Sequence, residues 1–231
     1  MSEENNNNNN QDQEQKQNQQ RQQQKQPITS DLAVVSDILP ERLTILPVDS
    51  RPFFPGITVP ITFTGSNFIE ALKRIGNSSQ PFVGLSLIKK VNKEEYLASE
   101  LYEVGTVVKI HKIVPVSEDS IQILVQGLER FEKVRYIRKE PMIEWEVKYY
   151  QDPDEKPSEE LKAYTLSIVN SVKELLKLNP VFQEQIKMVL NQISIEKPGV
   201  LMDLIASMLT ADGEKLQEVL ATYNLYKRGE R

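Results

Sequence analysis

The sequence predicts an α+β protein in which a small β-barrel is followed by an α-helical bundle. From about residue 43 to residue 150, short apolar runs of strand length alternate with turn residues. From residue 158 onward, apolar residues recur at helical spacing, and proline or glycine separates the repeats. The change falls at residues 151–157, an acidic stretch with two prolines, which we interpret as the domain boundary.

The first 26 residues differ from the rest in composition. They contain seven Asn and ten Gln, and Met1 is their one apolar residue. Such a segment cannot offset the entropy cost of ordering by burying apolar surface, so we predict a disordered tail over residues 1–30. Self-association through the Asn run is an alternative to this simpler interpretation as a solvated tail.

A β domain is expected over residues 41–150. The proline-rich stretch at residues 51–60 predicts turns and an edge strand, because proline has no N–H to donate to a central ladder. Residues 66–75 predict a short helix with Asn67 as its cap, and residues 117–120 predict a hairpin turn. This many short strands favours a closed or nearly closed small barrel. The predicted strands are residues 43–48, 61–65, 82–88, 101–110, 121–128, 131–137 and 143–149.

Four amphipathic helices are expected over residues 158–231 and would form a bundle. Ser158 is the predicted cap of the first helix, which ends at Asn179. The second begins with Pro180 at its first position, and the third follows Pro198 and Gly199. The fourth follows residue 212, and its apolar face includes residue 223.

No pattern of residues predicts catalysis. His111 is the single histidine and there is no cysteine, which excludes disulfides and a zinc site of ordinary ligand count. We interpret His111 as a strand residue whose ring is exposed or hydrogen-bonded. No phosphate-binding G-x-x-x-x-G-K-[ST] pattern occurs. We therefore predict no catalytic, cofactor-binding or metal-binding residue in this chain, and no enzyme activity of its own.

The overall charge also narrows the range of partners. The net charge of −5 disfavours a nucleic-acid partner that is held mainly through phosphate contacts. No run of about 18 apolar residues is available to span a membrane, and the polar first residues lack a secretory signal. The expectation is a cytoplasmic protein without nucleic-acid or membrane partners.

Four stretches resemble a known family. The first consists of residues 46–48, LPV, followed after a short spacer by residues 54–61, FPGITVPI. The other three are residues 101–110, LYEVGTVVKI, residues 123–131, ILVQGLERF, and residues 198–207, PGVLMDLIAS. In order and spacing they are similar to motifs of the N-terminal substrate-binding domain of Lon-type ATP-dependent proteases. The resemblance covers about residues 43–228. The spacer at residues 48–52 departs from that of many bacterial members, which leaves the local contact surface open.

The resemblance implies a PUA-like barrel and a role in protein quality control. The implied partners are unfolded or damaged proteins and the homo-hexamer of the parent protease. The implied reaction, ATP-dependent proteolysis with magnesium and a Ser-Lys peptidase, belongs to ATPase and peptidase parts that this chain lacks. We expect a fragment rather than a stand-alone protein. Two alternatives remain: a stand-alone Lon-like adaptor or scaffold that binds a folded partner, and an RNA-binding protein, which the acidic balance disfavours.

The proline-rich stretch predicts where a substrate would bind. If its apolar side chains are exposed, they form a patch that suits unfolded segments, and an edge strand there could add a peptide strand by backbone pairing. The alternative is that these residues only pack the end of the barrel. The candidate contact residues are Phe53, Phe54, Ile57, Pro60, Ile61 and Phe63.

Overall fold

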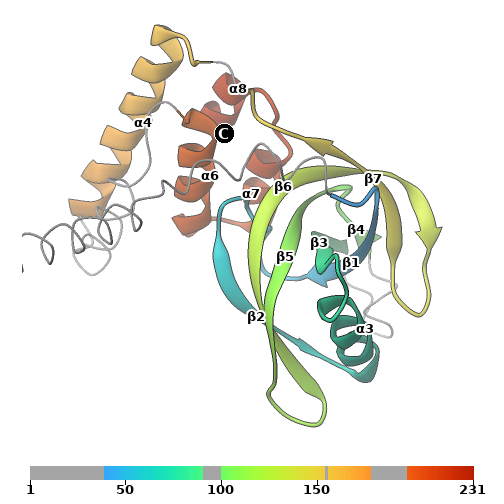
Figure 1. Ribbon diagram of the computed structural model, residues 1–231. Coiled ribbons are helices and arrows are strands. Elements are labelled where there is room, and N and C mark those ends of the chain that lie inside the picture. Colours follow the sequence, from blue (N-terminus) through green and yellow to red (C-terminus); the bar gives the residue numbers. More distant parts are fainter. Residues whose placement is uncertain (1–38, 91–99, 154–155, 178–196) are drawn as a thin grey trace, which may run out of the picture. The chain divides into compact units, whose positions relative to one another are not determined.

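The computed structural model describes residues 39–90, 100–153, 156–177 and 197–231, and its described elements lie in one compact unit, Pro40–Arg231. The described residues form a mixed, sheet-rich domain with five helices (Figure 1). The strands are β1 (Arg42–Val48), β2 (Thr58–Thr64), β3 (Phe82–Lys90), β4 (Glu100–Leu101), β5 (Val104–Pro115), β6 (Ser120–Arg138) and β7 (Glu144–Tyr150). The helices are α3 (Ser66–Gly76), α4 (Glu159–Lys177), α6 (Pro198–Met208), α7 (Gly213–Leu220) and α8 (Leu225–Glu230).

Strand β6 pairs with β5, β2 and β7. It pairs with β5 along one edge, while its other edge pairs first with β2, from residue 120 to residue 126, and then with β7, from residue 130 to residue 138. The prediction of two separate strands, at residues 121–128 and 131–137, is wrong. Shifts in register opposite Val107 and Val108 absorb the extra residue as a bulge, so the strand continues without a break.

Strand β1 has a neighbour on each side. It runs antiparallel to β7 from Arg42 to Thr44 and parallel to β3 from Ile45 to Val48. Because β3 also pairs with β5, the order β1-β7-β6-β5-β3 returns to β1. Strand β2 is outside this path and pairs only with β6 among the described strands.

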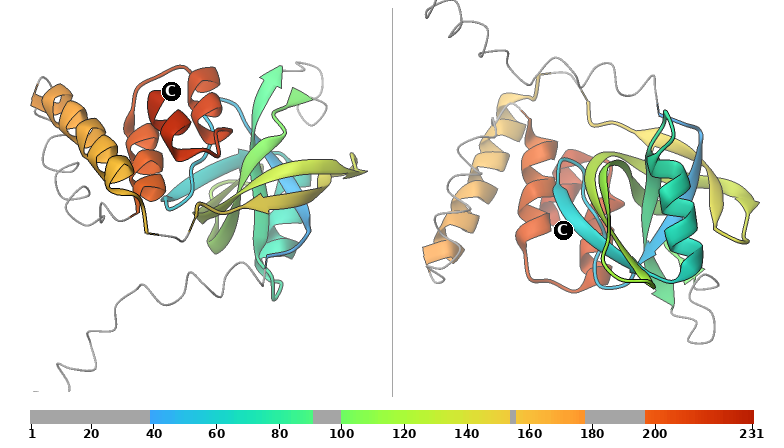
Figure 2. Two further views of the ribbon diagram at one scale, coloured as in Figure 1. Left: turned by 90° about the horizontal axis from the view of Figure 1, so that it is seen from above. Right: turned by 60° about the horizontal axis from the view of Figure 1, so that its bottom comes forward.

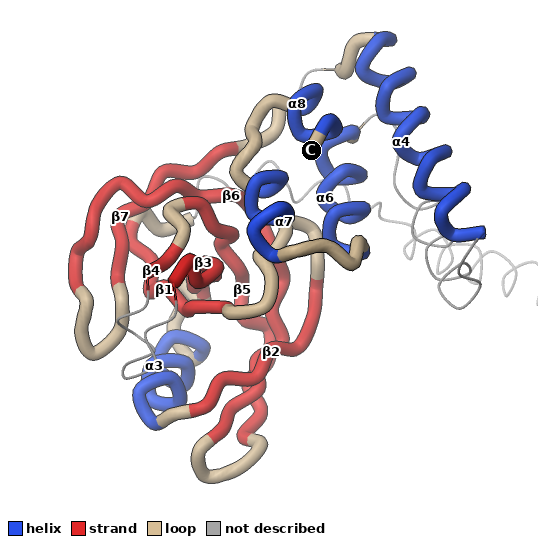
Figure 3. The backbone as a smooth tube through the Cα atoms, turned by 180° about the vertical axis from the view of Figure 1, so that it is seen from behind, coloured by secondary structure: helices blue, strands red, loops and turns tan. Residues whose placement is uncertain are grey.

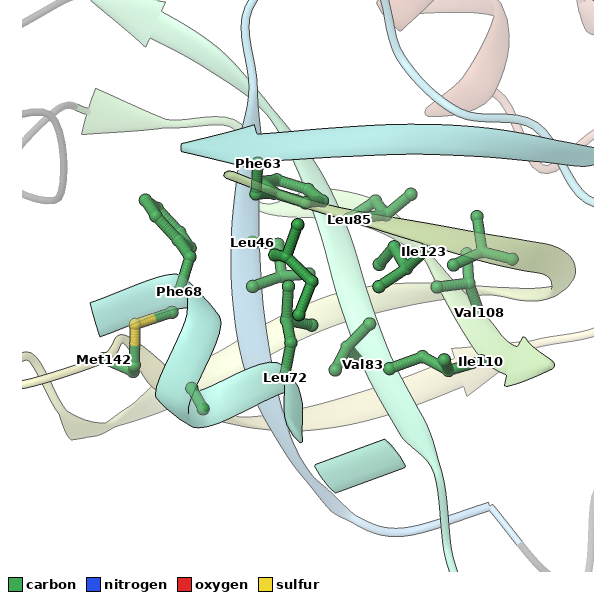
Figure 4. Packing of buried hydrophobic residues seen from close by; sticks show 13 residues of the cluster. Leu46, Phe63, Phe68, Leu72, Val83, Leu85, Val108, Ile110, Ile123 and Met142 are labelled. Carbon is green, nitrogen blue, oxygen red and sulfur yellow. The ribbon is translucent and has the colours of Figure 1, made fainter. Parts of the chain in front are cut away.

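The main hydrophobic core lies between the strands and α3. Phe63 of β2 and Phe68 of α3 are tilted rings with centroids 5.5 Å apart, and Leu46 of β1 is packed beside them (Figure 4). Helix α3 is present as predicted, but Asn67 is not its cap. The residue before the helix is Gly65, whose φ of 118° suits glycine, and no side chain caps the first turn.

The other four helices lie together, apart from α3 (Figures 2 and 3). Ser158 accepts a hydrogen bond from the backbone N–H of Leu161 (3.1 Å), which confirms it as the cap of α4. The predicted second helix, at residues 180–193, and the disordered tail lie outside the described residues. Helix α6 was predicted, and α7 follows Asp212, which accepts from the N–H of Glu214.

The prediction that the fourth helix includes residue 223 is wrong. Helix α7 stops at Leu220, and Tyr223 instead stacks on Tyr150 of β7, with the ring centroids 4.0 Å apart. A further helix, α8, was not predicted. Asn224 caps it by accepting from the N–H of Lys227 (3.1 Å). The apolar spacing alone predicts one continuous helix, but Tyr223 instead contacts the sheet and the chain continues as two helices.

A buried cluster of charges joins these helices to β6. Arg130 of β6 contacts Asp203 of α6 and donates from Nε to the carbonyl oxygen of Leu220 (2.9 Å). Arg228 of α8 holds Asp152 with both guanidinium nitrogens (2.7 and 3.0 Å) and lies 3.5 Å from Asp203. Burial raises the pKa of the Asp203 carboxyl, against the opposing attraction of Arg130 and Arg228.

Glu129 makes the stability of this junction depend on pH. Burial raises the pKa of its carboxyl from 4.5 to about 7, and Asp152 adds to the rise. The folded state therefore keeps a proton that the unfolded state loses, so the free energy of unfolding falls as pH rises from 4.5 to about 7 and levels off above.

The substitution Glu129→Gln replaces the carboxyl group with an amide, which is neutral at every pH. We expect the free energy of unfolding of the variant to equal that of the wild type near pH 5 and to be higher by roughly 1–2 kcal/mol at pH 8. This range is reduced because the side chain is only partly buried and solvent screens it. Urea unfolding across this pH range measures the difference. An equal gain at pH 5 and pH 8 would contradict the assignment.

Candidate functional site

The candidate site is a groove between the β1–β2 connection and strand β2. Its volume is about 680 Å³. Apolar side chains from both segments line it, together with Phe68 of α3 and Ser207 of α6. The other lining residues are Pro47, Val48, Asp49, Ser50, Arg51, Pro52, Phe53, Phe54, Ile57, Val59, Ile61, Thr62, Phe63 and Thr64.

Hydrogen bonds hold the wall of this groove that precedes β2. The N–H of Gly56 donates to the carbonyl oxygen of Gly127 (3.0 Å), and the N–H of Gly127 donates to that of Ile57 (2.8 Å). Thr106 donates from its hydroxyl to the carbonyl oxygen of Phe53. Gly56 has a φ of 81°, which favours glycine at this turn. The wall is therefore held in place by the backbone of β6 and by Thr106 of β5.

The predicted contact residues differ in their exposure. Five of the six line the groove, whereas Pro60 does not. Phe54 and Phe63 are buried, and Phe53, Ile57 and Ile61 are half-buried. Side chains alternate along β2, so Pro60 lies on the exposed face, opposite Ile61. Contact between any of these residues and a substrate stays a prediction.

Sequence reasoning did not select several of the lining residues. Val48 and Phe68 carry no local signal of a site, because the first ends a strand and the second occupies a core position of a helix. Their place in the groove depends on how α3 packs against β2 and β1. Val59, in contrast, could have been found, since it shares the period of two with Ile61 and Phe63.

The chain contains one histidine, His111. His111 is exposed, with Nε2 2.9 Å from the side-chain oxygen of Gln126, which confirms its interpretation as a hydrogen-bonded strand residue. In the described ranges, no three or more His, Asp or Glu side chains are grouped so that they could hold a metal ion. Among the described helices, none is long and apolar enough to cross a membrane.

Comparison with known proteins gives a consistent picture. The family model described as the ATP-dependent protease La (LON) substrate-binding domain matches residues 42–231. Lon protease 1 of Syntrophotalea carbinolica is 37% identical over 197 residues, which are 85% of this chain and 24% of the relative. Lon protease of Chlamydia pneumoniae is 40% identical over 193 residues, which are 83% of this chain and 23% of the relative. The chain thus spans about a quarter of the length of these relatives.

Solved structures share the fold. The N-terminal domain of Mycobacterium avium complex Lon protease superimposes with a TM-score of 0.63 at 17% identity, covering 82% of this chain and 94% of that one. A Lon N-terminal domain protein from Xanthomonas campestris gives a TM-score of 0.58 at 16% identity, covering 82% and 95%. At these identities the likeness concerns the fold alone.

Proposed function

The chain belongs to the family of ATP-dependent protease La (LON) substrate-binding domains, and from this premise we propose that it recognises unfolded or damaged proteins for a Lon-type protease. The observation that carries the proposal is the apolar groove beside β2. Folded proteins bury most large apolar side chains, so a groove lined by half-buried Phe53, Ile57 and Ile61 suits segments that only unfolded proteins expose.

Binding without catalysis is part of the same proposal. The chain would need no cofactor, and ATP, magnesium and the Ser-Lys peptidase would belong to other regions of the parent protease. A homo-hexamer in the cytoplasm would present six grooves, so weak single contacts would add up through multivalency. In finer detail, the strand order that returns to β1 supports a closed PUA-like barrel, and the four grouped helices support a bundle.

The test is a titration of the labelled chain with one protein, both folded and chemically unfolded. We expect preferential binding of the unfolded form. Ile61→Thr should weaken that binding by about threefold to tenfold, the effect of removing roughly 1 kcal/mol of apolar contact. Fluorescence anisotropy measures the affinity, and the melting temperature of each variant is measured alongside.

Ile113→Thr is the matched control. Ile113 is likewise a half-buried strand isoleucine packed against the main core, but it does not line the groove. Its substitution should lower stability by a similar amount and leave affinity unchanged. Equal weakening by both variants would argue against the groove. Preference for the folded form would instead favour an adaptor that docks a folded partner.

A further inference from the structure

Strand β2 has an outer edge, which is the edge turned away from β6. Next to this strand, Gly127 donates to the carbonyl oxygen of Ile57 (2.8 Å) and Gly65 donates to that of Asp119 (2.9 Å). In an antiparallel pair, alternate residues bond to the neighbour, so the odd-numbered residues of β2 face β6. The even-numbered residues 58, 60, 62 and 64 then direct their backbone groups away from β6. No described strand pairs with that edge.

The same edge borders the groove. Thr62 and Thr64 line it on the outer side of β2, and Ile61 and Phe63 line it through side chains that turn toward the core. Val48 at the end of β1 lines the groove as well. An extended chain placed here would therefore meet a row of hydrogen-bonding groups along its backbone and an apolar surface on one of its faces.

We propose that the groove takes an extended segment of an unfolded protein as an added strand beside β2, and that it selects segments with apolar side chains at every second position. This rests on the proposed function. Because pairing uses only the backbone of the bound segment, such binding tolerates many sequences. The side chains at alternate positions of the segment, which face the groove, provide the selectivity. A groove of 680 Å³ is within the range of about 300–1,000 Å³ typical of ligand sites.

Pro60 limits the pairing. It sits in the middle of the outer row and has no N–H, so the edge donates only from Thr58, Thr62 and Thr64. A proline at this position also protects an exposed edge from pairing with other copies of the chain. The outer row carries no charge, which suits neutral segments. The expected result is weak binding of short extended segments without self-association.

Methylated peptides test the backbone pairing. The probe is a labelled peptide of seven alternating threonine and valine residues with lysine at both ends, and the comparison is a shuffled peptide of the same composition. The alternating peptide should bind more tightly. N-methylation of either all valines or all threonines should abolish binding while methylation of the other set leaves it intact. The sensitive set is threonine for an antiparallel added strand and valine for a parallel one.

Two protein variants test the edge itself. Thr62→Pro removes an outward donor and should weaken peptide binding by about threefold to tenfold, the effect of one net hydrogen bond. Pro60→Thr supplies the missing donor and should tighten binding by a similar factor. Gln122→Ala is the control, because it removes the hydrogen bond that the Gln122 side chain donates to the Thr62 hydroxyl and leaves the backbone N–H groups of β2 unchanged.

The outcomes separate this inference from the function on which it rests. Equal sensitivity to both methylation patterns, together with normal binding by Thr62→Pro, would overturn strand addition, while unfolded-protein binding that depends on Ile61 would leave the proposed function in place. Failure to bind any peptide or unfolded protein would overturn both. Concentration-dependent dimers in gel filtration of the wild type would assign the edge to a second copy of the chain and overturn the proposal.

Discussion

Asp203→Ala is expected to lower the free energy of unfolding by about 3–5 kcal/mol. The side chains of Asp203, Arg130 and Arg228 are 2%, 4% and 0% exposed. Removing the carboxylate leaves Arg130 without its ion-pair partner and Arg228 with Asp152 alone, in a place that water does not reach. Urea unfolding at pH 7 measures the loss, and fluorescence of the single Trp145 gives a second probe of the transition.

Glu218→Ala is the control for Asp203→Ala. Glu218 also forms an ion pair, with Arg231 at 2.9 Å, but both side chains are more than half exposed. An exposed pair contributes about 0–1 kcal/mol, so this variant should unfold nearly as the wild type does. Losses of equal size in the two variants would show that the cluster does not hold the helices to β6.

Phe54→Ala is expected to cost about 3–5 kcal/mol of stability, the range for a large aromatic side chain removed from a core. Phe54 is 1% exposed and packs against Ala206 of α6 and against Leu216 and Leu220 of α7. The loss should therefore appear as a lower melting temperature of the whole transition, measured by circular dichroism.

Phe53→Ala provides the comparison for Phe54→Ala. Phe53 precedes Phe54 in the chain but is half-buried and lines the groove. We expect a smaller loss of stability and a clear loss of affinity for unfolded protein. If Phe53→Ala proved the more destabilising of the two, the burial pattern would not describe the protein in solution. Phe54 is unsuitable for testing substrate contact, because its substitution confounds binding with folding.

Local patterns predicted most of the strands and the start of α4. Strand β3 and the β5–β6 hairpin follow from apolar runs bounded by turn residues, and Ser158 caps α4 as its residue type suggests. The errors come from tertiary contacts. The stacking of Tyr223 on Tyr150 joins residues 73 positions apart, and the continuity of β6 depends on a bulge opposite β5.

The candidate site, like the fold, could be predicted in part from the sequence. Proline content marked the 51–60 stretch as edge and turn, which is where the groove lies. Because side chains alternate along a strand, neighbours such as Pro60 and Ile61 must point to opposite faces of β2, so sequence spacing alone separates them. The burial of Phe54 was not predictable in this way, since α6 and α7, which cover it, lie about 150 residues further along the chain.

The pairing of β1 with both β7 and β3 has a consequence for the time course of folding. Thr44 meets Glu144, so this pairing requires closure of a loop of about 100 residues, whereas the β5–β6 hairpin closes over a turn of a few residues. Loop closure costs entropy that grows with length, and distant contacts slow folding. We expect the hairpin to form early and β1 to join late. During synthesis β3 leaves the ribosome before β7, so Ile45 to Val48 can pair with β3 first, whereas Arg42 to Thr44 would stay without their partner strand until β7 has been made.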